Sequence, residues 1–231
     1  MKLLAFETAT EACSVAVWVD GEVRERFEVA PRRHAELALP WAEALLAEAG
    51  VARSQLDAIA VGRGPGAFTG VRLAIALAQG IALALDRPVV PVSTLATLAL
   101  QAPHGKVLAA IDARMGEVYA ATFLRDDDGV VATGSERVLS PSDVGLPDDS
   151  GDWQGVGTGF DAVDAALRVR LGVRFAGIDA TALPRAADTA RLAVAAFARG
   201  EAVAPERLEP AYLRDNVALT LVEQAALRAS R

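Results

Sequence analysis

Cysteine, histidine and aromatic residues are scarce in this chain, and each shortage excludes a class of protein. Cys13 is the one cysteine among 231 residues, so no disulfide can form within the chain, which fits a reducing compartment. The two histidines, His34 and His104, lie far apart, and Ala38 stands where a zinc-binding helix would carry a second histidine after His34. Aromatic residues make up 5% of the chain, so alanine, leucine and valine must build its core.

Acidic residues outnumber basic ones in this chain. The N-terminus also lacks the pattern of a secretion signal. The 23 lysines and arginines face 30 aspartates and glutamates, which gives a net charge of -7, whereas a broad nucleic-acid surface needs a basic stripe. The first residues lead directly into a strand pattern, without the basic and apolar regions of a signal peptide. Arg72 and Gln79 interrupt the longest apolar helix pattern, which is also too short to span a membrane. We expect a soluble cytoplasmic protein.

The most informative stretch, residues 61–86, joins a short apolar strand to a glycine-rich loop and an apolar helix. The helix pattern covers residues 71–85, with Thr69 as its predicted N-cap and Asp86 with Pro88 as its stop. The helix is apolar almost all round and carries many glycines and alanines. A helix of this kind needs cover on every side, so either the rest of the chain or a second chain must bury it.

Strand and helix patterns alternate around this stretch, which predicts an α/β fold. The predicted strands cover residues 2–6, 13–19, 22–29, 57–61 and 88–92. The predicted helices cover residues 32–49, 71–85 and 95–101. Pro40 predicts a kink or a delayed start in the first helix, and Ser93 with Thr94 would cap the third. Cys13 lies in the middle of a predicted strand, so we expect it to pack in the core.

The opening pattern of strand, acidic residue, turn and strand occurs a second time after residue 105. Glu7 and Asp112 hold equivalent places in the two copies, each directly after an apolar strand. A second glycine loop, residues 155–159, precedes a helix pattern as the first loop does. We interpret the repeat as an internal duplication, which predicts two α/β lobes. Further helix patterns cover residues 187–199 and 217–230.

Two features of this pattern could form a nucleotide site, and each also has a structural interpretation. Residues 62–67 match G-x-G-x-x-G/A, which cradles a pyrophosphate on backbone amides, although Pro65 removes one amide. The alternative, which we favour, is a tight loop that turns the strand into a close-packed helix. Glu7 and Asp112 could face each other across a cleft to hold a magnesium nucleotide or act as acid and base. Alternatively, each carboxylate accepts hydrogen bonds from the amides of its own turn.

Five motifs, in order over nearly the whole chain, resemble those of the bacterial TsaB (YeaZ) family. They are LLAFETATEACSVAV at 3–17, HAEL at 34–37, GRGPGAFTGVRLAIALAQGIA at 62–82, DARMGEVY at 112–119 and PAYLR at 210–214. The resemblance implies an actin-like (ASKHA) α/β fold of two duplicated, ribonuclease-H-like lobes, shared with sugar kinases and heat-shock ATPases. It implies a first lobe with the dimerisation helices at 1–104 and a second at 105–231, whose last helix, about 217–231, packs back on the first.

The same resemblance implies a role in making N6-threonylcarbamoyladenosine at position 37 of tRNAs that read ANN codons. Members of the family are expected to be non-catalytic scaffolds that form a homodimer, or a heterodimer with a TsaD-type transferase, and recruit a TsaE-type ATPase. ATP and a metal ion would bind to the partner subunits, and tRNA would meet this chain only through the complex. No cofactor or metal is expected in this chain, and Glu7, Thr8 and Asp112 are the candidates for any nucleotide site.

The helices at 32–49 and 70–85 are expected to form the dimerisation face, because they carry a surplus of apolar and small residues. The predicted interface residues are Leu39, Ala42, Leu45, Leu46, Gly70, Leu73, Ala74, Leu77, Ala78 and Ile81. A central charge, such as Ala74→Glu or Leu45→Glu, is expected to abolish the heterodimer while the monomer stays folded.

Three other functions stay open at this point. One is a stand-alone ATPase or small-molecule kinase with the same fold, and another is a glycoprotease-like metallopeptidase. The third is direct tRNA binding through the adjacent Arg32 and Arg33 or through Arg168 and Arg170, which would make binding strongly salt-dependent.

Overall fold

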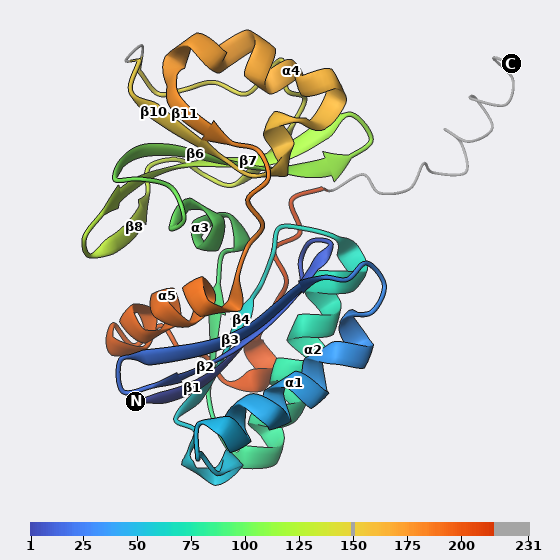
Figure 1. The fold of residues 1–231 in the computed structure, drawn as a ribbon, viewed down its shortest axis with the longest axis vertical. Helices are drawn as coiled ribbons and strands as arrows, with labels where there is room; N and C mark the ends of the chain where they lie inside the picture. Colours follow the sequence, from blue (N-terminus) through green and yellow to red (C-terminus); the bar gives the residue numbers. More distant parts are fainter. Residues whose placement is uncertain (149–150, 215–231) are drawn as a thin grey trace, which may run out of the picture.

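The computed structural model describes residues 1–148 and 151–214, which form two lobes, each built on one β-sheet (Figure 1). The first sheet has five strands in the order β3-β2-β1-β4-β5. They are β1 (Lys2–Glu7), β2 (Ala12–Val19), β3 (Glu22–Val29), β4 (Ala58–Gly62) and β5 (Val89–Val92). The second sheet has six strands, in the order β11-β10-β6-β7-β8 with β9 paired to β7. They are β6 (Gly105–Arg114), β7 (Glu117–Asp126), β8 (Gly129–Ala132), β9 (Arg137–Leu139), β10 (Trp153–Val156) and β11 (Phe175–Asp179).

The two sheets share one topology, which confirms the predicted duplication. In the first sheet, β1 pairs with β2 antiparallel and with β4 parallel, and β4 pairs with β5 parallel. In the second sheet, β6 pairs with β7 antiparallel and with β10 parallel, and β10 pairs with β11 parallel. Glu7 ends β1, and Asp112 lies near the end of β6, so the two acids occupy equivalent places.

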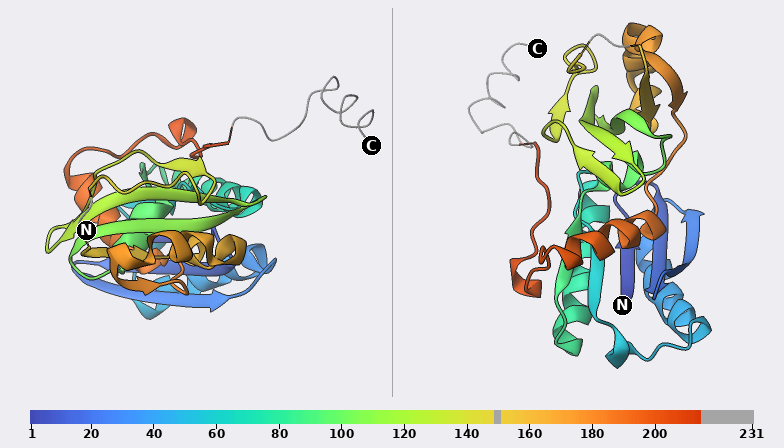
Figure 2. Two further views of the ribbon diagram at one scale, coloured as in Figure 1. Left: turned by 90° about the horizontal axis from the view of Figure 1, so that it is seen from above. Right: turned by 90° about the vertical axis from the view of Figure 1, so that its left-hand side faces the viewer.

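Helices cover both faces of the first sheet, as the alternation of its side chains requires. Helices α1 (His34–Glu48) and α2 (Phe68–Leu85) pack against one face, where Leu4, Phe6 and Val15 point. Helix α5 (Ala186–Ala198) packs against the other face, where Leu3, Ala5 and Ala16 point (Figure 2). The contacts with α5 are mostly between alanines, so this helix lies close to the sheet.

Two helices pack on the sheet of the other half of the sequence, which corrects the predicted lobe boundaries. Helix α3 (Thr94–Ala99) precedes residue 104, yet Leu95 and Leu98 pack on the second sheet. Helix α5 follows the second sheet, yet it covers the first. Helix α4 (Ala162–Leu171) packs on the second sheet through Leu167 and Leu171. A single cut between residues 104 and 105 therefore does not separate the lobes, and the helix predicted at 217–231 lies outside the described residues.

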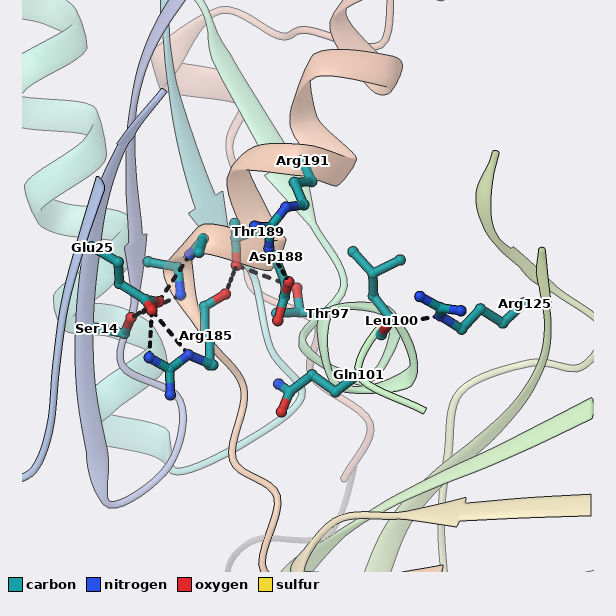
Figure 3. Close-up of polar contacts among 12 residues, drawn as sticks. Ser14, Glu25, Thr97, Leu100, Gln101, Arg125, Arg185, Asp188, Thr189 and Arg191 are labelled. Atoms are coloured by element: carbon teal, nitrogen blue, oxygen red, sulfur yellow. Dashed lines mark hydrogen bonds and ion pairs between the residues drawn. The ribbon is translucent and has the colours of Figure 1, made fainter. Parts of the chain in front are cut away.

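The exchanged helices meet at the junction of the lobes, where polar side chains fix them (Figure 3). The hydroxyls of Thr97 on α3 and Thr189 on α5 lie 3.3 Å apart. The first amides of α5 are satisfied from the first sheet, because Ser14 Oγ accepts from Ala186 N at 2.8 Å and a Glu25 oxygen accepts from Ala187 N at 3.0 Å. These bonds replace the partners that a helix N-terminus lacks.

The predicted ends of the main helices are partly wrong. Helix α2 begins at Phe68, so Thr69 lies in its first turn and does not cap it. Helix α1 runs from His34 to Glu48 with Pro40 inside it, so its start lies two residues after the predicted one. Asp86 ends α2 in the left-handed conformation, and the Ser93 side chain caps α3, both as predicted.

Candidate functional site

The acidic end of β1 lies beneath the glycine loop, out of contact with solvent. Glu7 is 1% exposed, and its carboxylate accepts from Ala9 N at 2.9 Å and from Thr94 Oγ1 at 3.0 Å. A Cβ on Gly62 would stand 2.0 Å from Glu7 Oε2, so glycine at this position leaves room for the carboxylate. Desolvation raises the pKa of Glu7 from 4.5 to about 7, against the lowering effect of its hydrogen bonds from Ala9, Thr94 and Thr8.

The glycines of the first loop permit close packing rather than an open cradle. A Cβ on Gly66 would lie 2.4 Å from the carbonyl of Ala9, and one on Gly70 would lie 2.0 Å from the carbonyl of Thr8. Thr8 itself is buried, and its hydroxyl donates to the Gly70 carbonyl at 2.7 Å. The loop is therefore filled by the chain's own backbone, which supports the tight-loop interpretation.

The second copy repeats this arrangement with different partners. A Cβ on Gly157 would lie 2.3 Å from the carbonyl of Ala110. Ala110 lies on β6, two residues before Asp112. Asp112 Oδ1 accepts from Arg114 N at 2.7 Å, and its other oxygen pairs with the Arg114 guanidinium at 2.8 Å. Thr158 Oγ1 accepts from Asp112 N at 3.2 Å. Glu7 and Asp112 thus each accept a hydrogen bond from the backbone amide two residues further along the chain.

A cavity of about 520 Å³ lies between the two lobes. The first lobe contributes the turn after β1, the start of α1 and the start of α2, and the second contributes the turn after β6. Asp112 lines this cavity and Glu7 does not. The structure therefore does not bring the two predicted carboxylates to one open site, because the glycine loop closes over Glu7.

His34 makes a hydrogen bond to the backbone, and Cys13 packs in the core. His34 Nε2 lies 2.9 Å from the carbonyl of Thr10, which occupies one of its ring nitrogens. Cys13 is fully buried in the first core, as predicted, and burial raises the pKa of its thiol to about 11. In residues 1–148 and 151–214, no group of three or more histidine, cysteine or acidic side chains is placed to hold a metal ion.

The predicted dimerisation residues divide into buried and accessible sets. Six are buried in the first lobe, where they pack against the sheet or the β1 turn: Ala42, Leu45, Leu46, Gly70, Ala74 and Ala78. The other four are exposed or half-buried: Leu39, Leu73, Leu77 and Ile81. The expectation that Ala74→Glu or Leu45→Glu would leave the monomer folded is therefore wrong, since both would place a carboxylate in the core.

Helix α2 turns a second apolar face away from its own lobe. By length and composition this helix could cross a membrane, a test that core helices of globular proteins also pass. Its outward face carries small residues, Ala76, Gly80 and Ala84, at a spacing of four.

Sequence reasoning missed an aromatic pair at the mouth of the cavity. Phe68 and Tyr212 are 57% and 55% exposed, and their ring centroids lie 6.5 Å apart. The Arg72 guanidinium lies 3.4 Å above the Phe68 ring, and its Nε donates to the Tyr212 hydroxyl at 2.7 Å. Phe68 and Tyr212 are far apart in the sequence, so only the fold reveals the pair.

Comparisons with known proteins agree on the family. Residues 27–221 match the family model described as "TsaD: tRNA N6-adenosine threonylcarbamoyltransferase". The chain is 46% identical to the tRNA threonylcarbamoyladenosine biosynthesis protein TsaB of Escherichia coli, over 94% of this chain and 96% of that protein. It is 38% identical to TsaB of Haemophilus influenzae, over 94% and 95% of the two chains.

Solved structures give the same result. YeaZ from Pseudomonas aeruginosa matches with a TM-score of 0.83 at 47% identity, covering 92% of this chain and 99% of that one. A second structure, described as an uncharacterized protein with similarity to peptidase YeaZ from Pseudomonas aeruginosa, matches with a TM-score of 0.86 at 49% identity and the same coverage. The fold is thus the two-lobe, actin-like α/β fold, and the chain belongs to the TsaB (YeaZ) family of tRNA threonylcarbamoyladenosine biosynthesis proteins.

Proposed function

We propose that this chain is a non-catalytic scaffold needed for N6-threonylcarbamoylation of adenosine 37 in tRNAs that read ANN codons. It acts in the cytoplasm by dimerising with a TsaD-type transferase and recruiting a TsaE-type ATPase. The self-dimer uses the same surface and competes with the heterodimer. ATP and the metal ion bind to the partner subunits.

The observation that carries this proposal is the outward face of α2. Leu73, Leu77 and Ile81 flank the small residues Ala76 and Gly80, so another helix can approach the α2 backbone closely. The opposite face of α2 is already buried in the first lobe. A stable interface buries about 1,600 Å² in total, and a long apolar helix supplies a suitable centre for one.

The acidic residues support a scaffold over a stand-alone ATPase or kinase. Such an enzyme needs a carboxylate that can reach the nucleotide or its metal ion. Glu7 is closed off beneath Gly62 and Thr94, and Asp112 is held by Arg114. A metallopeptidase would need a ligand set, and His34 has Ala38 where a second histidine would stand.

The test is a charge on the outward face of α2. Ala76→Glu is expected to abolish the heterodimer with the transferase on a sizing column, because a buried, unpaired carboxylate in a helix contact costs several kcal/mol. Ala76 is exposed, so the monomer should stay folded. Ala198→Glu makes the same change at an exposed position at the end of α5 and should bind the transferase normally. Normal transferase binding by Ala76→Glu would contradict the proposed placement.

A further inference from the structure

The aromatic pair at the cavity mouth is built as a rigid platform. Ala211 N donates to the Arg63 carbonyl at 2.8 Å, which fixes the chain beside Tyr212 to the first lobe. Arg214 donates to the Ala113 carbonyl at 3.2 Å and pairs with Glu117, which fixes the same segment to the second lobe. The segment 210–214 therefore holds Tyr212 in place from both sides.

The platform presents flat, partly exposed surfaces to solvent. Phe68 and Tyr212 each expose more than half of their surface, and the exposed Arg72 guanidinium lies over the Phe68 ring. Met115, which is 80% exposed, lines the same cavity from the second lobe. Aromatic rings and arginine planes are the groups on which proteins stack unpaired bases.

Basic side chains outnumber acidic ones around the platform, on a chain that is acidic overall: Arg32, Arg114 and Arg214 line the cavity with Glu11 and Asp112, and Arg72 lies over Phe68. Arg72 pairs with no carboxylate among the described residues, and its bond goes to the neutral Tyr212 hydroxyl. Arg32 lines the same cavity, is exposed, and has no ion-pair or hydrogen-bond partner in residues 1–148 and 151–214. Arg114 is also exposed there, although Asp112 neutralises it. An anionic ligand would meet uncompensated cations here, whereas the net charge of the chain is -7.

We propose that Phe68, Arg72 and Tyr212 stack an unpaired base of the tRNA substrate within the complex, with Arg32 contacting a neighbouring phosphate. A flat base fits the exposed ring and guanidinium faces, and the phosphate supplies the negatively charged partner that Arg32 lacks. A protein partner would have to place acidic side chains opposite these arginines, whereas a nucleic acid carries a phosphate beside every base. The proposal rests on the proposed function, because tRNA reaches this surface only when the chain works in the modifying complex.

The test uses the complete complex with an unmodified tRNA transcript that reads an ANN codon. Phe68→Leu is expected to raise the KM for tRNA about tenfold, in keeping with the loss of one base–aromatic contact, while Phe68→Trp restores it. Arg32→Gln should lower the slope of log KM against log salt by about 0.7–0.9, the effect of one lost phosphate contact. Val173→Ala, a change at an exposed apolar position on the second lobe, should leave the KM unchanged.

Two results would overturn the inference. One is an unchanged KM for tRNA in both Phe68→Leu and Tyr212→Leu. The other is loss of complex assembly on a sizing column by folded Phe68→Leu, which would make the platform a protein-docking surface. Failure of the proposed function is a separate outcome, since the wild-type chain would then be dispensable for tRNA modification.

Discussion

Glu7 is a buried acid that contacts no side chain of opposite charge in residues 1–148 and 151–214. Its carboxylate accepts hydrogen bonds from an amide and a hydroxyl, yet burial raises its pKa to about 7. The unfolded chain releases this proton at about pH 4.5, so between these values the folded state holds the extra proton. The stability contributed by Glu7 is therefore complete below about pH 4.5 and is lost as the pH rises through about 7.

Glu7→Gln should remove this pH dependence. The variant keeps the shape of the side chain but never ionises, so its stability relative to the wild type should increase as the pH is raised from 5 to 8. The expected slope of the difference is at most about 1.4 kcal/mol per pH unit. Urea unfolding at several pH values measures this, and parallel stability curves for the two proteins would contradict the assignment.

Two glycines on neighbouring elements should respond in opposite ways to alanine. Gly62→Ala would drive a Cβ to 2.0 Å from the Glu7 carboxylate, and overpacking of this kind costs about 1–3 kcal/mol. A Cβ on Gly80 meets nothing within 4 Å, and alanine in a helix is favoured over glycine by up to about 1 kcal/mol. Thermal unfolding of the two variants should show a loss for Gly62→Ala and a gain for Gly80→Ala.

At the residue scale, the sequence predicts some positions correctly but does not show which side of an apolar helix is buried. The core position of Cys13 follows from its place in a strand, and the Ser93 cap follows from its place before a helix. The burial of Ala74 and Leu45 could not be separated from the exposure of Ala76 and Leu39, because α1 and α2 carry apolar residues on nearly every side. Only the position of the sheet decides which side faces inward.

At the scale of helices and strands, local sequence patterns predict the elements but not the lobe on which each of them packs. Strands β1, β2 and β4 and helix α2 follow from runs and periodicity, but the exchange of α3 and α5 between the lobes does not. Helix α3 is short and helix α5 is rich in alanine, so the apolar face of each could pack on either sheet. The sheet on which each helix packs is set by the path of the chain and, for α5, by polar contacts with Ser14 and Glu25, which are distant in sequence.

The attachment of α5 to the first sheet should depend on Ser14. Ser14→Ala removes the acceptor of the buried Ala186 amide, and an unsatisfied buried donor costs about 1–3 kcal/mol. Urea unfolding should show this loss. Ser142→Ala, at an exposed loop position, should change stability by less than about 0.5 kcal/mol. Equal stability of the two variants would show that Ser14 does not hold the helix.

At the scale of the whole molecule, the duplication was predictable and the connection between the lobes was not. The repeat of strand, acid and turn predicts two similar sheets, which the strand orders confirm. The contacts that join the lobes come from residues far apart in the chain. Glu136 of the second lobe pairs with Arg63 at 3.1 Å and also accepts from Ser93, and Arg214 pairs with Glu117. No local pattern in the sequence identifies these pairs.

The two acids that the duplication places in equivalent positions, Glu7 and Asp112, do not form an open pair between the lobes, because Asp112 lines the cavity and Glu7 does not. His34→Ala should accordingly leave tRNA modification largely intact, since this histidine binds the Thr10 carbonyl and has Ala38 one turn later. Mass spectrometry of the modified adenosine, with complex yield measured in parallel, tests this. Loss of modification at normal yield would make the residue catalytic.

The central claim is that this chain contributes to tRNA modification through its interface. The most direct measurement is the yield of threonylcarbamoyladenosine, by mass spectrometry, in a reconstitution that supplies the transferase, the ATPase, threonylcarbamoyl-adenylate and tRNA. We predict that modification requires the wild-type chain, fails with Ala76→Glu and is normal with Ala198→Glu. Normal modification without the chain, or with Ala76→Glu, would contradict the account.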